Sequence, residues 1–106
     1  MFSIIIPSFN NFDYLKLCIE SIKKTSKLNN QIIVHVNEDF DGKTRAYLNH
    51  NKIEHTFSIK NIGLCSSINL AVKNASMKYI LYSHDDMYFC PGWEDSLITE
   101  IDNIKH

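Results

Sequence analysis

The sequence predicts an α/β domain, with a mostly parallel sheet of about four strands flanked by helices. Three observations lead there. Short apolar, β-branched runs alternate with segments whose apolar residues recur every three or four positions. This alternation repeats four times in 106 residues, a length that suits one small domain or part of a larger one. Polar clusters directly follow three of the predicted strands. Strands and helices that alternate in this way form parallel sheets through right-handed crossovers.

The first half of the chain carries two predicted strands and two predicted helices. Residues 3–6 form a short apolar run of the kind buried on both faces, and Pro7 is expected to end it. Residues 12–24 follow a helical pattern, with apolar positions on one side and mostly charged positions on the other. Residues 31–36 form the second predicted strand, and a weaker helix is expected over residues 44–50 after a polar loop.

The second half repeats the arrangement. Residues 53–59 form the third predicted strand, and Gly63 in the next turn is expected to adopt a positive φ or allow a close approach. Residues 64–75 are amphipathic, residues 78–83 form the fourth strand, and residues 93–104 form the last helix. The apolar sides expected for the two helices comprise Leu64, Ile68, Ala71, Val72 and Ala75, and Trp93, Leu97, Ile98, Ile101 and Ile104.

Composition excludes several classes of protein. The formal net charge is −1 and the sequence has no basic run, so nucleic acid is not an expected partner. The start of the chain does not resemble a signal peptide, and no apolar run approaches the roughly 20 residues that cross a bilayer. We therefore expect a cytoplasmic protein, which would reach the cytoplasmic face of a membrane through an acceptor or partner. Cys18, Cys65 and Cys90 are predicted to be reduced core thiols.

The polar clusters at residues 7–10, 37–41 and 84–86 follow the first, second and fourth predicted strands. Because the carboxyl ends of parallel strands lie at one edge of a sheet, these clusters are expected to converge there on a ligand. Asp85 and Asp86 are adjacent carboxylates at a strand end, an arrangement that repels itself unless a cation is present. The alternative is an exposed turn or the cap of the next helix.

The phosphate-binding motifs of other nucleotide folds are missing from this sequence. The turn after the first strand reads PSFNNF, without the GxGxxG glycines, and there is no GxxxxGK[ST] loop. Backbone amides therefore do not cradle phosphate in either of these ways. The remaining option is a divalent ion held by carboxylates, which neutralises a diphosphate through oxygen ligands.

Four stretches, in order and at suitable spacing, carry a family resemblance. They are SIIIPSFNNFDYLKLCIESI, IIVHVNEDFDGKT, NIGLCSSINLAVKNA and YILYSHDDMYFCPGW. The chain resembles the amino-terminal, nucleotide-sugar-binding half of family 2 glycosyltransferases, which are inverting enzymes with the three-layer, Rossmann-like GT-A fold. The resemblance spans nearly the whole chain, so residues 1–106 are expected to form a single GT-A-type domain that lacks the acceptor-binding half.

The resemblance also implies site residues. In the variant DxD motif His84-Asp85-Asp86, Asp86 falls where the family binds the metal, Mn²⁺ or Mg²⁺, with His84 as a second and less certain ligand. Glu38 takes the place of the acid that accepts the uracil N3–H, and Asn37 replaces the acid before it. The implied nucleotide-binding residues are Pro7, Ser8, Phe9, Asn10, Asn37, Glu38, Asn61, Asn69 and Asp85.

The implied reaction transfers a sugar, with inversion, from a nucleoside-diphosphate donor, UDP by preference, to a saccharide, lipid or protein acceptor. The catalytic base of the family lies beyond the DxD strand, and Glu94 or Asp95 would be a poor substitute. A partner subunit or a second copy is therefore expected to supply the acceptor site. Two other classes remain open: a non-catalytic nucleotide or nucleotide-sugar binding module, and an α/β interaction domain whose acids are structural. Trp93 is expected in the core, and the aromatic residues Tyr79, Tyr82, Tyr88 and Phe89 are expected mostly to pack.

Overall fold

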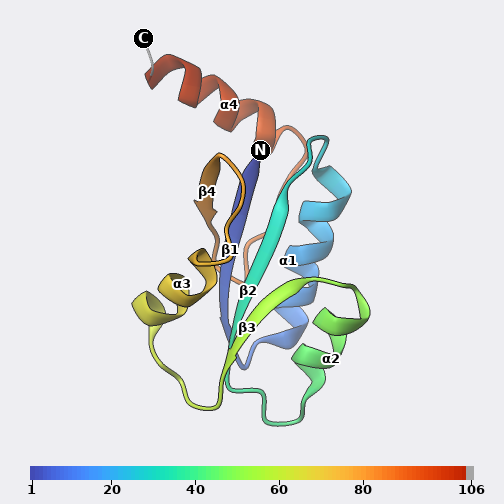
Figure 1. Ribbon diagram of the computed structural model, residues 1–106. Coiled ribbons are helices and arrows are strands. Elements are labelled where there is room, and N and C mark those ends of the chain that lie inside the picture. The colour runs from blue at the N-terminus through green and yellow to red at the C-terminus, as the bar shows by residue number, and fades with distance from the viewer. Residues whose placement is uncertain (105–106) are drawn as a thin grey trace.

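The structure, a computed structural model, describes residues 1–104 and is a three-layer α/β domain (Figure 1). Four parallel strands lie in the order β3-β2-β1-β4. The predicted fold class is confirmed. The elements are β1 (Phe2–Phe9), α1 (Phe12–Thr25), β2 (Gln31–Asn37), α2 (Lys43–His50), β3 (Glu54–Ser58), α3 (Leu64–Val72), β4 (Tyr79–Tyr82) and α4 (Trp93–Ile104).

The two faces of the sheet carry cores of different size. One face, covered by α1 and α2, buries a large cluster that includes Ile4, Ile6, Ile19, Val34 and Leu48. On the other face, α3 is the one helix of the described residues that covers the sheet, and it buries a smaller cluster around Ile5, Ile33 and Ala71. Alternate residues of β1 and β2 thus enter opposite layers, as expected for strands buried on both sides.

Pro7 does not end the first strand, which continues to Phe9 in register with Asn37 of β2. The prediction of a strand over residues 3–6 was therefore too short. The carbonyl of Ile5 accepts a hydrogen bond from Ser83 N, so Ile5 directs its backbone groups toward β4. Pro7 directs its nitrogen to the same side, beyond the last residue of β4, where no donor is needed.

Other boundaries differ less from the prediction. Helix α3 ends at Val72 instead of residue 75, because Asn74 N and Ala75 N already bond in tight turns, to Ala71 O and Val72 O. Gly63, before this helix, has φ +85°, so the expected positive φ is confirmed. Leu64 was placed on the apolar side of this helix, but its side chain is exposed.

Helix α4 is attached at the amino edge of the sheet, far along the strands from their carboxyl ends (Figure 1). The carboxylate of Glu94 is buried and accepts hydrogen bonds from Lys27 N, Leu28 N and Asn30 Nδ2. Trp93 packs against the core and donates from its indole N–H to Thr25. Trp93 is thus a core residue as predicted, and Glu94 is structural.

Two other predictions were wrong in part. Cys18 is a buried free thiol, but Cys65 and Cys90 are free and exposed, so only one of the three is a core thiol. Tyr88 is exposed and does not join the packing of Phe89 against Trp93. Among residues 1–104, no helix is both long enough and apolar enough to cross a bilayer.

Candidate functional site at the carboxyl edge of the sheet

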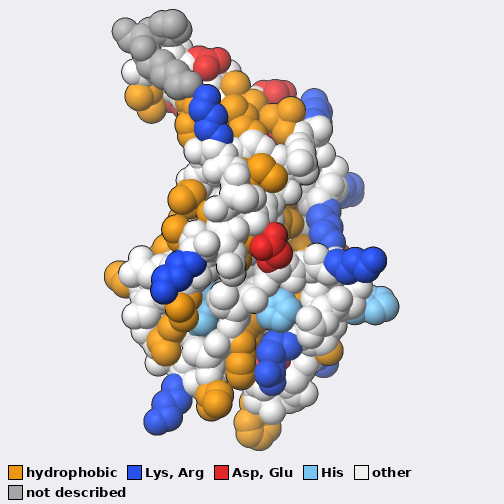
Figure 2. All heavy atoms as spheres, in the orientation of Figure 1, with side chains coloured by type: hydrophobic (Ala, Val, Ile, Leu, Met, Phe, Trp, Pro, Cys, Tyr) orange, Lys and Arg blue, Asp and Glu red, His pale blue; other side chains and the backbone are white. Residues whose placement is uncertain are grey.

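A hollow of about 300 Å³ lies at the carboxyl edge of the sheet, where the polar clusters converge. Most of its lining comes from the end of β1, the end of β2, the loop before α3 and the segment after β4. Two exposed apolar side chains, those of Phe9 and Leu64, lie on its wall. In Figure 2, hydrophobic side chains also reach the surface at the lower end of the molecule. The lining residues are Pro7, Ser8, Phe9, Asn11, Asn37, Asn61, Gly63, Leu64 and Asp85.

Asp85 joins the first and last strands of the chain at this hollow. Ser8 Oγ donates to Asp85 Oδ2 at 2.9 Å, and Asn11 Nδ2 donates to Asp85 Oδ1 at 3.0 Å. Asn11 occupies the N-cap position of α1 but makes no cap hydrogen bond with its side chain. Both oxygens of Asp85 thus have a neutral donor, which fixes this carboxylate against the end of β1 and the start of α1.

His84 and Asp86 flank Asp85 in the chain; both are exposed, and neither lines the hollow itself. His84 Nδ1 is 3.0 Å from the Tyr82 hydroxyl, whereas Asp86 has no hydrogen-bond or ion-pair partner among the described residues. Burial, and then the charges of Asp85 and Asp86, raise the pKa of Tyr82. Asp86 is therefore the carboxylate of this segment that the protein leaves available to a ligand.

The donor set fits a divalent ion only if the ligand completes the coordination. Within residues 1–104 there is no group of three or more His, Cys, Asp or Glu side chains that could hold a metal. Asp86 supplies a hard carboxylate of the kind that Mg²⁺ and Mn²⁺ prefer, and such ions commonly take one or two carboxylates plus phosphate oxygens and water. The residues fit a metal held jointly with a diphosphate.

Cys18 lies beneath this segment, with Sγ 3.9 Å from Ser83 Oγ and 3.7 Å from the His84 carbonyl. Burial, together with the nearby charges of Asp85 and Asp86, raises the pKa of the Cys18 thiol to about 11. A thiol must lose its proton to act as a nucleophile or metal ligand. Cys18 is therefore a packing residue.

Asn37, at the end of β2, forms the opposite wall of the hollow and is only 4% exposed. Its Oδ1 accepts from Ser58 Oγ at 3.0 Å and from Ile62 N at 3.2 Å. Its Nδ2 donates to Ser67 Oγ at 2.6 Å. The Asn37 amide thus joins β2, β3, α3 and the loop before α3, and its hydrogen-bonding capacity is largely used within the protein.

Glu38 lies next to this wall, although it does not line the hollow. Its backbone is left-handed, with φ +58°, and its N–H donates to Ser58 O at 2.9 Å. Glu38 Oε2 accepts from Asn61 N at 3.1 Å, and Asn61 Oδ1 accepts from Gly63 N at 2.9 Å. Glu38 therefore supports the loop that carries Asn61 into the lining.

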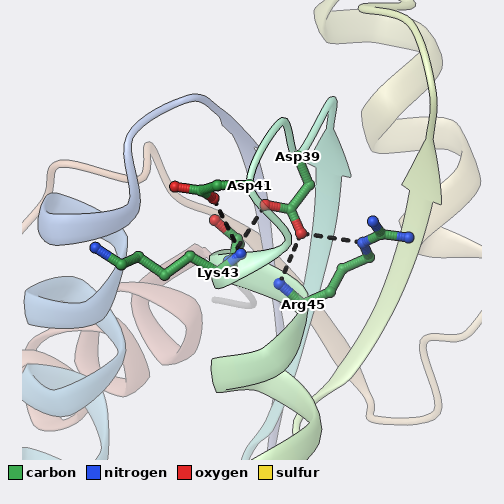
Figure 3. Close-up of polar contacts among 5 residues, drawn as sticks. Asp39, Asp41, Lys43 and Arg45 are labelled. Carbon is green, nitrogen blue, oxygen red and sulfur yellow. Dashed lines mark hydrogen bonds and ion pairs between the residues drawn. The ribbon is translucent and has the colours of Figure 1, made fainter.

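Asp39 and Asp41 organise the start of α2 (Figure 3). Asp39 accepts from the backbone N–H groups of Thr44 and Arg45 and from Arg45 Nε, the last at 3.0 Å. Burial alone would raise the pKa of Asp39, but these hydrogen bonds and the Arg45 charge outweigh it and lower the pKa. Asp41 accepts from Lys43 N. Both acids are occupied as helix caps.

The structure thus brings six predicted nucleotide-binding residues to the hollow and leaves three outside its lining. Asn10 has a left-handed backbone and is exposed, Glu38 is one residue beyond, and Asn69 lies on the exposed side of α3. Asn11, Gly63 and Leu64 line it without having been predicted. Asn11 follows directly on the PSFN turn, a sequence position that already pointed to it.

A larger hollow, of about 550 Å³, lies at the amino edge between the end of α1 and the starts of β2 and β3. It is lined by amide and aliphatic side chains together with Lys23, Lys52 and Glu54. Of these two hollows in the described part of the chain, only the one at the carboxyl edge combines strand-end polar clusters with an adjacent unpartnered carboxylate, so we place the candidate site there.

The fold and this site define a class: three-layer, Rossmann-like α/β domains whose ligand site lies at the carboxyl edge of a parallel sheet. The sequence model of glycosyl transferase family 2 matches residues 3–106, and the chain belongs to that family.

Similar proteins agree with this assignment. An uncharacterized glycosyltransferase of Rickettsia typhi is 32% identical over 105 residues, covering 95% of this chain and 33% of the relative. Another, of Rickettsia bellii, is 34% identical over 90 residues, covering 82% of this chain and 13% of the relative. The chain therefore spans a third or less of the length of these relatives.

The fold is also similar to that of solved structures. The crystal structure of S. aureus TarS 1–349 superposes with a TM-score of 0.81 at 19% identity, covering 96% of this chain and 32% of TarS 1–349. The same TarS fragment in complex with UDP gives a TM-score of 0.80 at 20% identity. At these identities the likeness concerns the fold alone.

Proposed function

We propose that this chain is the donor-binding domain of an inverting glycosyltransferase that takes a nucleoside-diphosphate sugar, UDP by preference, through a divalent metal. The hollow at the carboxyl edge would hold the nucleotide, with Pro7, Ser8, Phe9 and Asn61 on its wall. Asp86 would contact the metal and the diphosphate, with His84 as a weaker ligand. Asn10, Glu38 and Asn69 remain predicted nucleotide contacts.

One observation carries the proposal: Asp86 is exposed and unpartnered among the described residues, and it follows Asp85, which lines a hollow on which the ends of β1 and β2 converge. Adjacent Asp85 is satisfied by two neutral donors. A protein that kept both acids only for structure would be expected to use both. Membership of family 2 and a neighbour in complex with UDP favour the same ligand.

In the proposed reaction, an acceptor hydroxyl displaces the nucleoside diphosphate at the anomeric carbon in one step, with inversion. The bound divalent metal, Mn²⁺ or Mg²⁺, would supply charge neutralisation for the departing diphosphate. Asp85 would keep the segment after β4 fixed to the end of β1 and the start of α1, so that Asp86 faces the phosphates. Phe9 would pack near the base, and Glu38 would accept from it.

We propose that the catalytic base and the pocket for a saccharide, lipid or protein acceptor come from an acceptor-binding half, a partner subunit or a second copy. A cytoplasmic location stays a prediction.

Thermal unfolding with UDP, with Mn²⁺ and with both tests the proposal, since a ligand that binds only the folded state stabilises it. At about 100 times its Kd a ligand adds roughly 2.7 kcal/mol, a rise in Tm on the order of 10 °C for a domain of this size. We expect this rise only with both ligands and not in Asp86→Ala. Asp102→Ala, which removes an exposed acid of α4, is the matched control and should behave as wild type.

The other classes of function predict different results. A non-catalytic binding module would show the same shift but would support neither sugar transfer nor hydrolysis of the donor. An interaction domain with structural acids would show no shift with any nucleotide, and that result would refute the donor site.

A further inference from the structure

A fully buried histidine lies beneath the wall of the hollow and has no place in the proposed reaction. His35 is the fifth residue of β2, is 0% exposed, and shares the α3 side of the sheet with Ile33 and Asn37. Its Nδ1 is 2.7 Å from Thr56 Oγ1, and its Nε2 is 3.0 Å from Ser58 Oγ and 3.2 Å from Asn37 Oδ1. A polar ring in this layer must hydrogen bond, and it does so at both nitrogens.

The surrounding bonds determine the tautomer. Ser58 Oγ donates its hydrogen to Asn37 Oδ1, so both groups near His35 Nε2 are available to it as acceptors. Nε2 therefore carries the hydrogen, and Nδ1 accepts from the Thr56 hydroxyl. His35 is then neutral, and among the described residues no buried side-chain nitrogen or oxygen lacks a partner.

The network continues from His35 to the loop that walls the hollow. Asn37 Oδ1, oriented by Nε2–H and Ser58, accepts the backbone N–H of Ile62. On its other side Asn37 donates to Ser67 Oγ, which donates to Gly63 O at 2.6 Å. Ile62 N is thus bonded directly to the Asn37 amide, and Gly63 O is linked to the same amide through Ser67, so a flip of the amide would disturb both contacts.

We infer that His35 is a positioning residue of the nucleotide site: its neutral imidazole locks the Asn37 amide, and the locked amide holds the wall at residues 61–63 in its binding geometry. The role in donor binding rests on the function proposed above; the control of the wall does not.

Protonation of His35 would disfavour this arrangement, because it places a positive charge in a buried layer. The Thr56 hydroxyl, which now donates to Nδ1, would have to turn and accept from it. No carboxylate is placed to compensate. On β3, Glu54 accepts from Gln31 and His55 bonds to Ile53 O; at the end of β2, Glu38 accepts from Asn61 N. Strand β1 has no ionisable side chain, and α3 has only the exposed Cys65. Burial accordingly lowers the pKa of His35, although the bond to Asn37 partly opposes this.

Amide hydrogen exchange of Ile62 tests the inference without nucleotide, because this N–H bonds directly to Asn37. His35→Val should lower its protection at least about 10-fold through local opening. His35→Gln, whose Nε2 reproduces the donor at imidazole Nε2, should restore protection to within about 3-fold. Val34→Ala, a buried change on the opposite face, is the control and should leave Ile62 unchanged relative to wild type. Long-range ¹H–¹⁵N correlation should show the Nε2–H tautomer.

The second arm measures the Kd of UDP with Mn²⁺ for the same proteins. His35→Val should weaken binding about 10-fold at pH 7, while His35→Gln and Val34→Ala stay near wild type. Below pH 6.5 the wild type should lose affinity relative to His35→Gln, a comparison that cancels the titration of UDP itself. Unchanged Ile62 protection in His35→Val, or an Nδ1–H tautomer, would overturn the inference. If wild type binds no UDP while Ile62 responds as expected, the proposed function fails and the control of the wall stands.

Discussion

The two sides of the hollow differ in how completely the protein satisfies its own polar groups. On the β2–β3 side, His35, Asn37, Ser58 and Ser67 form a closed network with a partner for each polar atom. On the β4 side, His84 and Asp86 are exposed, and Asp86 has no bonded partner among the described residues. The β2–β3 side is therefore preorganised without a ligand, whereas the β4 side keeps an unpaired carboxylate, Asp86, for one.

This difference separates two tasks. A buried polar network fixes shape, because any displaced member leaves others unsatisfied. An exposed carboxylate contributes little to shape but keeps its full capacity for a cation. Asp85 is intermediate between these two roles, because its carboxylate is partly buried and bonded to Ser8 and Asn11. Mutations on the two sides should therefore affect different measurements.

Asn37→Leu should produce the largest effect, because it removes the acceptor of Ser58 and Ile62 and the donor to Ser67 inside a buried layer. We expect a loss of about 3 kcal/mol in the free energy of unfolding, measured by urea denaturation. Asn61→Ala, at the exposed side of the same wall, is the control and should cost less than about 1 kcal/mol. A loss below about 1 kcal/mol for Asn37→Leu would show that the network does not stabilise this side.

Replacing the two adjacent acids should sharpen the contrast. Asp85→Ala should lower the free energy of unfolding by roughly 1–2 kcal/mol in the absence of nucleotide, because two hydrogen bonds to a carboxylate are lost. Asp86→Ala should stay within about 0.5 kcal/mol of wild type under the same conditions. Equal losses in the two variants, measured by urea denaturation without metal, would contradict the division of roles.

The smallest effect on stability should come from lowering the pH. The pKa of His35 is lowered from 6.5 in the folded protein, so the unfolded chain takes up its proton at higher pH. Its contribution to stability is thus complete above pH 6.5 and is lost as the pH falls toward the folded value, with a slope of at most about 1.4 kcal/mol per pH unit. Urea denaturation between pH 5 and 7.5 should show this slope as the difference between wild type and His35→Gln. Parallel curves would exclude a titrating His35.

Most of the fold could be predicted from the sequence because hydrophobic periodicity reports burial. The eight elements follow alternating patterns, and α4 has the predicted bounds. The misplaced details depend on neighbours that periodicity does not encode. Pro7 remains in β1 because β4 stops short of it. Leu64 is exposed because α3 buries Ser67 and Ala71 instead, and Ser67 has a polar partner in Asn37.

The site was partly predictable for a different reason. Parallel strands bring their carboxyl ends together, so the grouping of Ser8, Asn37 and Asp85 could be predicted from the sequence. Which of these groups are occupied within the protein could not be predicted. Asp39 and Asp41 resemble ligand acids in sequence but cap α2 (Figure 3). The closed bonding of Asn37 depends on side chains from β3 and α3.

The buried thiol of Cys18 can serve as an intrinsic probe of local opening of the segment after β4. With its pKa near 11 and its sulfur covered by Ser83 and the His84 carbonyl, it will react with an alkylating reagent only when the segment after β4 lifts from α1. In a variant with Cys65 and Cys90 replaced by serine, the alkylation rate of Cys18 would measure how often this opening occurs, without any added label. A donor and metal bound at Asp86 would hold this segment closed and lower the alkylation rate of Cys18. The rate would then report occupancy of the site from a residue that does not contact the ligand.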